Sequence, residues 1–563
     1  MLDRSGGPCL PSNPMTTFEG PPVAGVEGVG ALTLGGFLGE VVARFGPNEA
    51  IVLDDPMRDG ETVRWTYARL GAETRRIGRA LLAAGVAPGD AVGVLMGNRP
   101  EAVAAIFGAA LAGAVAAPMS TFSPRPELAH LVDTCRATVV LTQSRLLARR
   151  FGEDLAAIAR DRPDLRRVVV LGDPSWDELL AAGEAVPDDE LDTRAAATTP
   201  DDPALVIFSS GTTSAPKGIL HRHGSPSLQC WLQARVFARH PGTRMFSALP
   251  LFWTAGFNTA VGATLAAGGC WVAQETFDPT AALALMARER VTEPYTLPHQ
   301  TAALAEHPDW ETADLSGLRC VYGKGAYARH PRVEADPGWI MPVGWGMSET
   351  CAFVCAHPSD TPREQAKVGH GALLPGARLR VVDPETGTLL GVDEEGELCV
   401  SGATRMIGYL GRSQDECFDE DGFFHTGDAG HVSADGNVHW SGRRTEMIKT
   451  GGANVSPAEV EVALRACRPV KLSRVLGVPD ARLDQAVVAC IVLRDGEAAT
   501  AEDVRAFLRE RVAAYKVPKH VLFFEDDEMP MTGSDAKVRD DALLELVHTR
   551  LATAGVTPGK GER

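Results

Sequence analysis

The chain lacks the features of a secreted, disulfide-bonded or zinc-binding protein. Its eleven cysteines are scattered without a Cys-x-x-Cys pair, and no zinc-ligand pattern surrounds Cys351 and Cys355, the closest two. An odd, dispersed set of cysteines is typical of reduced thiols in the cytoplasm. The N-terminus carries no basic stretch followed by a long apolar one, so we expect no secretory signal. These absences predict a cytoplasmic location.

Membrane-length apolar runs and positive charge are also missing. Residues 102–117 are apolar and uncharged, but this stretch is shorter than a membrane span and predicts a buried helix that runs into a strand. The formal net charge of −18 argues against nucleic acid as the main partner. With 563 residues, 45% of them hydrophobic and 23% charged, the composition is that of a globular protein of roughly two to four domains.

One loop lacks the order of a Walker A motif yet carries the groups that bind phosphate. A predicted strand at 204–208 leads into Ser209-Ser210-Gly211-Thr212-Thr213-Ser214-Ala215-Pro216-Lys217-Gly218. The hydroxyls, the backbone N–H groups and the ammonium of this loop can surround an anion. Loops of this composition are often plain surface turns, so the loop alone leaves both interpretations open.

Strands and helices alternate on both sides of this loop, which predicts a mostly parallel sheet covered on both faces. The expected strands are 92–96, 115–118, 138–141, 245–249 and 270–273, and the expected helices are 99–112, 126–134, 254–265 and 280–290. From residue 377 the pattern changes to short strands and Gly-rich turns. The predicted domains are a loose tail (1–28), a large domain (29–443), a hinge (444–446) and a compact α+β domain (447–563).

The order of several separated motifs resembles the adenylate-forming superfamily of acyl-CoA synthetases, luciferases and the adenylation domains of peptide synthetases. The resemblance covers roughly residues 32–546 and implies an α/β fold, with a large N-terminal adenylation domain of several subdomains and a small mobile α+β C-terminal domain. The motifs that carry it are the phosphate loop, Leu249-Pro250-Leu251-Phe252-Trp253, Gly344-Trp345-Gly346-Met347-Ser348-Glu349-Thr350, Gly396-Glu397-Leu398 with Gly402, Phe424-His425-Thr426-Gly427-Asp428, Gly442-Arg443, Lys449-Thr450-Gly451-Gly452 with Pro457 and Glu459, and Lys537.

The resemblance assigns the chemistry of adenylation to particular residues. When a carboxylate attacks the α-phosphorus of ATP, the negative charge must be offset by Mg²⁺, by lysine and by N–H or O–H donors. Glu349 supplies an oxygen ligand of the kind Mg²⁺ prefers, with Thr212 as a second ligand, and both are predicted to be catalytic. Asp428 can accept both ribose hydroxyls. The other predicted ATP or AMP contacts are Ser209, Ser210, Gly211, Thr213, Lys217, Gly325, Ala326, Gly344, Trp345, Gly346, Met347, Ser348 and Arg443. For Trp345, stacking on adenine and a place in the core both stay open.

The resemblance also implies a second half-reaction, in which the acyl group passes to a thiol after the small domain turns about Glu446. Lys449, Gly451 and Gly452 are then expected to line the thiol channel, where glycine allows a close approach to the backbone. A plain turn before the next helix is the other interpretation of these glycines.

Lys537 is the expected catalytic lysine of adenylation, and the chain departs from the family pattern beside it. Ala536 and Ser214 stand where the family usually has glycine, and Glu446 stands where the hinge is commonly aspartate. Alanine resists positive φ, which bears on the loop before Lys537. None of these changes removes a charge that the chemistry needs.

The predicted acid pocket contains Trp253, Phe257, Gly323 and Met347, which are apolar or small. We therefore expect an apolar acid, although Lys324 either pairs with a second carboxylate or points to solvent. The predicted reaction joins a carboxylic acid to coenzyme A through an acyl-adenylate, with ATP and Mg²⁺ and release of pyrophosphate. The alternatives are transfer to a separate carrier protein or an amine, and a non-catalytic nucleotide-binding relative. No nucleic acid and no transmembrane segment are expected, and the sequence does not separate a monomer from a homodimer.

Overall fold

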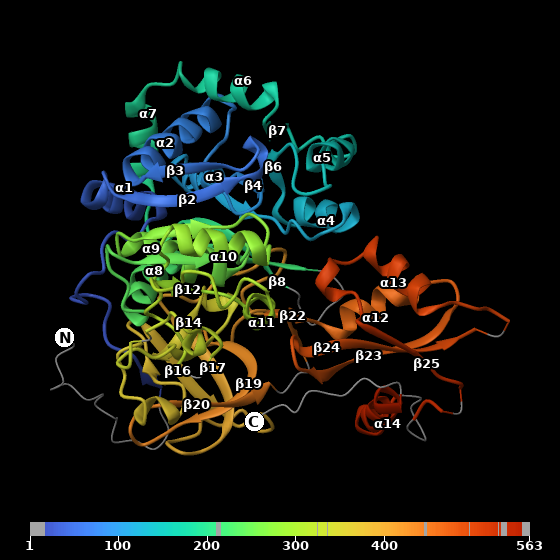
Figure 1. The fold of residues 1–563 in the computed structure, drawn as a ribbon. Coiled ribbons are helices and arrows are strands. Elements are labelled where there is room, and N and C mark those ends of the chain that lie inside the picture. Colours follow the sequence, from blue (N-terminus) through green and yellow to red (C-terminus); the bar gives the residue numbers. More distant parts are fainter. Residues whose placement is uncertain are drawn as a thin grey trace.

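The computed structural model describes residues 17–209, 216–323, 325–334, 336–443, 447–494, 496–526, 528–530 and 538–553. Figure 1 shows a large body, coloured blue to orange, and a smaller orange-red body beside it. The described part of the chain contains no helix long and apolar enough to cross a membrane. Residues 210–215, Lys324, 444–446 and Lys537, which carry several predicted roles, lie outside the described residues.

A seven-stranded sheet forms the first part of the large body. Its inner strands are parallel, whereas β8–β9 and β9–β18 are antiparallel. The strand order is β18 (Gly408–Tyr409), β9 (Lys217–Arg222), β8 (Pro203–Ser209), β5 (Val115–Pro118), β4 (Ala91–Leu95), β6 (Ala137–Gln143) and β7 (Arg167–Leu171). The predicted phosphate loop therefore joins two adjacent antiparallel strands, with Ser209 opposite Lys217.

A second, five-stranded sheet packs against the same core. Its order is β12 (Glu293–Pro294), β10 (Arg244–Ser247), β11 (Cys270–Ala273), β2 (Glu49–Asp55) and β3 (Glu61–Thr66). Helices α3 (Pro100–Leu111) and α8 (Gly224–Val236) are buried along almost their whole length, as expected for helices between packed layers. The other helices of these layers are α1 (Leu34–Phe45), α2 (Tyr67–Ala83), α4 (Arg125–Cys135), α5 (Phe151–Ala159), α6 (Pro174–Gly183), α7 (Asp188–Ala197), α9 (Ala263–Ala266), α10 (Pro279–Arg288) and α11 (Pro298–Ala305).

Two antiparallel sheets complete the large body. The first contains β13 (Val343–Gly346), β14 (Phe353–His357) and β15 (Ala372–Leu373). The second has the order β1 (Phe18–Glu19), β16 (Ala377–Val382), β17 (Gly396–Gly402), β19 (Phe424–Val432) and β20 (Val438–Arg443). Strand β1 lies inside the segment predicted as a loose tail, because Phe18 is buried against the β16–β17 layer.

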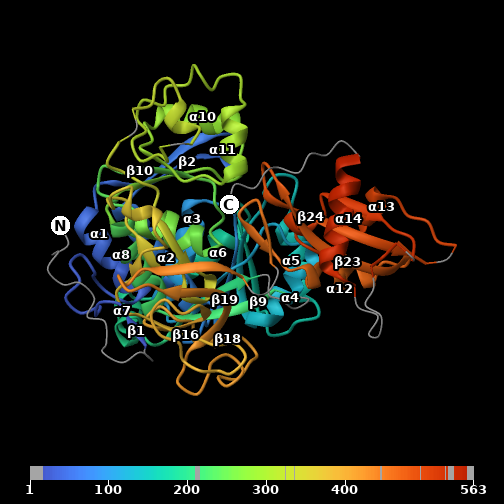
Figure 2. The same cartoon turned by 90° about the horizontal axis from the view of Figure 1, so that it is seen from below.

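The small body has its own hydrophobic core. Two clusters of buried residues lie wholly within residues 448–551. The strands are β21 (Ile448–Thr450), β22 (Ala453–Val455), β23 (Val470–Asp480), β24 (Asp484–Leu493) and β25 (His520–Phe523), and the helices are α12 (Pro457–Arg465), α13 (Ala501–Arg509), η6 (Ala514–Lys516) and α14 (Asp540–Thr553). In both views this body lies beside helices α4 and α5 of the large one (Figures 1 and 2).

Candidate functional site

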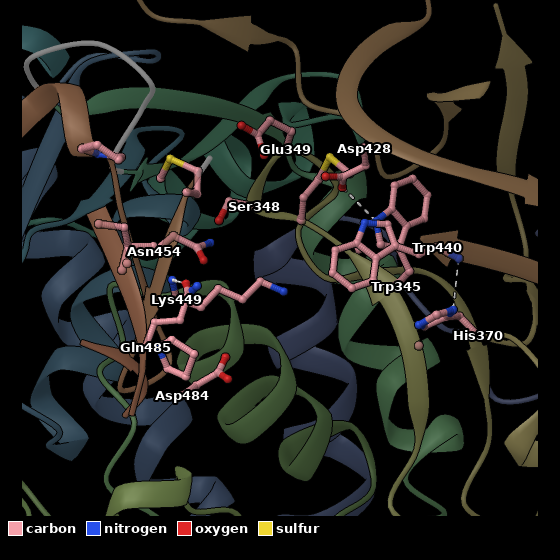
Figure 3. A pocket seen from close by; sticks show the side chains of 18 of the residues that line it. Trp345, Ser348, Glu349, His370, Asp428, Trp440, Lys449, Asn454, Asp484 and Gln485 are labelled. Carbon is pink, nitrogen blue, oxygen red and sulfur yellow. Dashed lines mark hydrogen bonds between the residues drawn. The ribbon is translucent and has the colours of Figure 1, made fainter. Parts of the chain in front are cut away.

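Two cavities lie where the large and small bodies meet. The first, of about 960 Å³, is called the large cavity and is lined by Gly344–Glu349, Asp428 and Trp440 on one side and by residues of β21, β22 and β24 on the other. Figure 3 shows Glu349, Asp428 and Lys449 around it. The second, of about 270 Å³, is called the aromatic cavity and includes Trp253, Tyr295, Phe353 and Tyr515. Met347 and Ser348 line both cavities, so the two are adjacent.

A tight turn after β13 presents Glu349. Gly346 is needed there, because a Cβ at this position would lie 2.0 Å from the Ala352 carbonyl oxygen. His221 on β9 donates from Nε2 to the Ser348 carbonyl at 2.9 Å. Burial lowers the pKa of His221 to about 4, so the ring is neutral at pH 7 and its hydrogen bond holds the turn without adding charge.

Tyr409 links Glu349 to the end of the phosphate loop. Its hydroxyl donates to Glu349 Oε1 at 2.7 Å, and the Lys217 ammonium lies 5.2 Å from the centre of its ring. Burial, followed by the charge of Arg412, lowers the pKa of Lys217, while the nearby Glu349 opposes that shift. The described part of the loop therefore brings a cation and a carboxylate to one place, joined by an aromatic ring.

Asp428 is held by the motif that precedes Glu349. Trp345 Nε1 donates to Asp428 Oδ2 at 2.9 Å, and Thr426 Oγ1 accepts from the Asp428 N–H at 3.0 Å. Trp345 belongs to a core cluster and still borders the large cavity, so it combines packing with orientation of the carboxylate. In the β19–β20 pairing, Arg443 stands directly opposite Asp428.

His425 and Glu397 support the turn that carries Asp428. His425 Nδ1 donates to Glu397 Oε2 at 3.0 Å, and the other oxygen of Glu397 accepts from the Gly427 N–H at 2.9 Å. The Cys399 sulfur lies 3.4 Å from the same ring nitrogen. Burial raises the pKa of Cys399, so this side chain is a neutral thiol at pH 7.

The hydrogen-bonded pair of His425 and Glu397 predicts that the thermal stability of the protein depends on pH. The hydrogen bond to Glu397 raises the pKa of His425 despite partial burial. A raised pKa in the folded state stabilises the fold most below the ordinary histidine value of 6.5, and this contribution is lost as pH rises through the raised pKa. We therefore expect His425→Gln to lower Tm more at about pH 6 than at about pH 9.

Melting curves of the wild type and the variant at both pH values measure this. His520→Gln is the matched control, because burial lowers the pKa of His520 and its substitution should show no extra loss at acid pH. An equal loss of Tm at both pH values in His425→Gln would contradict the charged pair.

One wall of the aromatic cavity comes from a π-helix at Ala255–Gly262, within the segment predicted as an ordinary helix. Thr254, Ala255 and Thr259 line the cavity, whereas Phe257 is fully buried in the core against Phe107. The wider turn of a π-helix places residues five apart on one face, which brings Thr254 and Thr259 together and turns Phe257 away. Gly323, Gly325 and Ala326, predicted for the acid pocket or the nucleotide, line neither of these two cavities.

The β21–β22 hairpin brings Lys449 and Gly452, two of the three predicted thiol-channel residues, to the cavities, whereas Gly451 lines neither of them. The Lys449 ammonium lies 4.4 Å from the centre of the Trp440 ring, within cation–π range. Gly452 has φ +82° and lines the aromatic cavity, and a Cβ there would lie 2.4 Å from Leu297 of the large body. The hairpin therefore lies against the large body, with a glycine at a position where a side chain would clash.

Several site residues escape prediction from the sequence. Tyr295, Tyr515 and Phe353 line the aromatic cavity although they belong to no predicted motif. Tyr409 and His221 hold the Glu349 turn from strands β18 and β9. In the sequence, the only indication of such residues is a polar side chain within an apolar stretch, such as His221 within Gly-Ile-Leu-His.

The residues present fit Mg²⁺, because Glu349 is a carboxylate that borders the large cavity beside Lys217 and the ends of the phosphate loop.

Known sequence families match both bodies. The family described as AMP-binding enzyme matches residues 39–410, and the family described as AMP-binding enzyme C-terminal domain matches residues 459–536.

Individual relatives match over most of their length. Feruloyl-CoA synthase from Amycolatopsis sp. is 35% identical, over 87% of this chain and 95% of its own. Indoleacetate–CoA ligase from Aromatoleum aromaticum is 32% identical, over 86% and 93%. Among solved structures, the amide bond synthetase McbA from Marinactinospora thermotolerans superposes with a TM-score of 0.74 at 26% identity, over 91% of this chain and 99% of that one.

Proposed function

The chain belongs to the AMP-binding enzyme family and is an AMP-forming acid–CoA ligase, and from this premise we propose that its acid is apolar and carries a ring. The observation that supports this substrate is the aromatic cavity. It is bordered by Trp253, Tyr295, Phe353 and Tyr515, and none of the described residues that line it is charged. A cavity of this composition favours a flat apolar group and does not compensate a second carboxylate.

The residues around the large cavity suit the nucleotide. We propose that Asp428, oriented by Trp345, accepts the ribose hydroxyls, and that Glu349 holds Mg²⁺ with Tyr409 fixing one of its oxygens. When bound, Mg²⁺ offsets charge on the phosphates. Lys217 supplies a fixed positive charge near the same carboxylate. Hydrogen-bond donors and charges that are already held in position before the reaction stabilise the charge that develops in the transition state.

The acceptor is proposed to enter along the β21–β22 hairpin. Gly452 and Asn454 line the aromatic cavity, and Lys449 lines the large one, so the hairpin borders both. A thiol that reaches this place meets the acyl group at the junction of the two cavities. Gly452 lets the hairpin backbone lie close to Leu297 of the large body at the edge of the aromatic cavity, where a larger side chain would clash.

Substrate profiling tests the proposed acid. With ATP, Mg²⁺ and CoA, we expect kcat/KM to be highest for aryl acids such as cinnamate, lower for octanoate, and lowest for acetate and succinate. Pyrophosphate release and thioester formation are measured together. A preference for acetate or succinate would contradict the proposed acid, and ADP with orthophosphate would exclude adenylation. Amide formation with supplied amines, at a rate above that with CoA, would favour the alternative acceptor.

Tyr295 offers a sharper test of the same cavity. Tyr295 and Thr259 both line the cavity; burial raises the pKa of the Tyr295 hydroxyl to about 12, and the nearby Thr259 side chain opposes that shift. They can therefore bind a polar group on the ring of the acid. We expect 4-hydroxycinnamate to be preferred over cinnamate, and Tyr295→Phe to reduce that preference by roughly tenfold, the size of one hydrogen bond. Cinnamate itself is the control and should be used as before. An unchanged ratio of kcat/KM would place the ring substituent elsewhere.

A further inference from the structure

Lys516 is a buried cation at the junction of the two bodies. Its side chain is 1% exposed, and its ammonium contacts Glu127 at 3.1 Å and Glu459 at 2.6 Å. Glu127 belongs to α4 of the large body, whereas Glu459 and Lys516 belong to the small one. The pair between Lys516 and Glu127 therefore crosses the boundary between the bodies with almost no access to water.

Both carboxylates lie in the first turn of a helix. Glu127 is in the first turn of α4, and Glu459 is in the first turn of α12. The partial positive charge of a helix N-terminus favours a carboxylate. Lys516 is thus placed between two helix starts from two bodies, and the dipoles help to balance the second negative charge. Such a buried pair is costly to break on one side, because an uncompensated charge would remain.

The residue before Lys516 closes the aromatic cavity. Tyr515 lines this cavity, and its ring lies 6.4 Å from Trp253 and 6.1 Å from Phe122, centre to centre. Both partners belong to the large body. Since Tyr515 and Lys516 are neighbours on η6, the ion pair and the ring are fixed together. One wall of the cavity is therefore supplied by the small body, and the wall depends on where that body sits.

We infer that Lys516 is a positioning residue whose buried pair with Glu127 holds the small domain in the orientation described here and seats Tyr515 on the acid pocket during thioester formation. The inference rests on the proposed function for its timing, because the β21–β22 hairpin faces the cavities in this orientation. The structural part of the inference rests on the contacts alone: the ion pair of Lys516 with Glu127, which we call the latch, joins the two domains.

The arrangement also explains how the latch opens. If the small domain turns away, Lys516 keeps Glu459, which lies on its own domain and is the nearer partner. Glu127 then passes to water at the start of α4, where the helix dipole and hydration stabilise its charge. Neither group is left buried and unpaired, so the contact is reversible.

Glu127→Gln tests the role in catalysis. The substitution keeps the shape of the side chain and removes its charge. We expect thioester formation from supplied acyl-adenylate to fall by roughly tenfold or more, since the pair is buried, and pyrophosphate release in the first half-reaction to stay unchanged. Glu306→Gln is the matched control, because it breaks another contact between the bodies, the ion pair of Glu306 with Arg482. The side chain of Glu306 is 59% exposed and that of Arg482 is 64% exposed. Exposed pairs contribute little, so this control should behave as wild type.

Equal losses in both half-reactions, or none in either, would overturn the inference. A second measurement does not depend on the reaction. In a Glu306→Cys, Arg482→Cys background, a short bismaleimide reports how often the two bodies adopt this orientation, and the ten cysteines of the described residues are buried or half-buried. Adding Glu127→Gln should slow cross-linking severalfold, and an unchanged rate would overturn the latch. Slower cross-linking without thioester formation from any acid would instead contradict the proposed function and leave the latch standing.

Discussion

Glu349→Gln is expected to slow formation of the acyl-adenylate by roughly 10²-fold or more, the scale for losing one electrostatic contact in a transition state. The amide keeps the size of the side chain and its contact with Tyr409, but it has no negative charge to hold Mg²⁺. The measurement is pyrophosphate release against Mg²⁺ concentration. Near-normal turnover at saturating Mg²⁺ would remove Glu349 from the site.

Tyr409→Phe is the control for this prediction. It removes the hydroxyl that donates to Glu349 Oε1 while the carboxylate remains. We expect a weaker apparent affinity for Mg²⁺ with a smaller loss of rate, because orientation is impaired and charge is not. A loss as large as that of Glu349→Gln would mean that Tyr409 itself contacts the reacting groups.

Lys537→Ala is expected to reduce acyl-adenylate formation at least as strongly, while thioester formation from supplied acyl-adenylate is largely kept. The reason is the role that the family resemblance gives to this lysine, a positive charge shared by the attacking carboxylate and the α-phosphate. Lys537 lies outside the described residues, so the prediction is made from the sequence. Half-reaction assays on the purified variant measure it.

Lys519→Ala is the matched control in the same domain. Lys519 pairs with Asp480 at the surface, and its side chain is 44% exposed. Removing it should leave both half-reactions near wild type, since exposed pairs contribute little. If Lys537→Ala lowers both half-reactions alike, the two steps do not use different parts of the small domain.

Buried strands were the most predictable part of the fold. The strands at 115–118 and 270–273 are apolar runs between turn signals, and the structure has them with the same bounds. The order of motifs also predicts the family, and this is confirmed by the matches over both bodies. Strand β9 was not predicted, because Lys217 and Gly218 begin it inside a loop-like sequence and its pairing with β8 is a tertiary feature.

The site was less predictable where its residues come together only in three dimensions. Tyr295 and Tyr515 are 220 positions apart in the sequence, yet both line the aromatic cavity. Phe257, which was predicted to line the acid pocket, faces the core, because local periodicity does not reveal a π-helix. Glu349 and Asp428 border the large cavity as the motifs implied, and their catalytic roles stay predictions.

A change in length of the π-helix at Ala255–Gly262 would reshape the aromatic cavity without altering the large cavity. A π turn holds one residue more than an α turn, so deleting a single residue there would restore α-helical winding and rotate the following side chains by about 100°. Thr259 would leave the cavity and another residue would replace it. Strands β8, β13 and β19, which position the phosphate loop, Glu349 and Asp428, would keep their lengths and register. The shape of the aromatic cavity can therefore change through chain length in one short helix, independently of the strands that position Glu349 and Asp428.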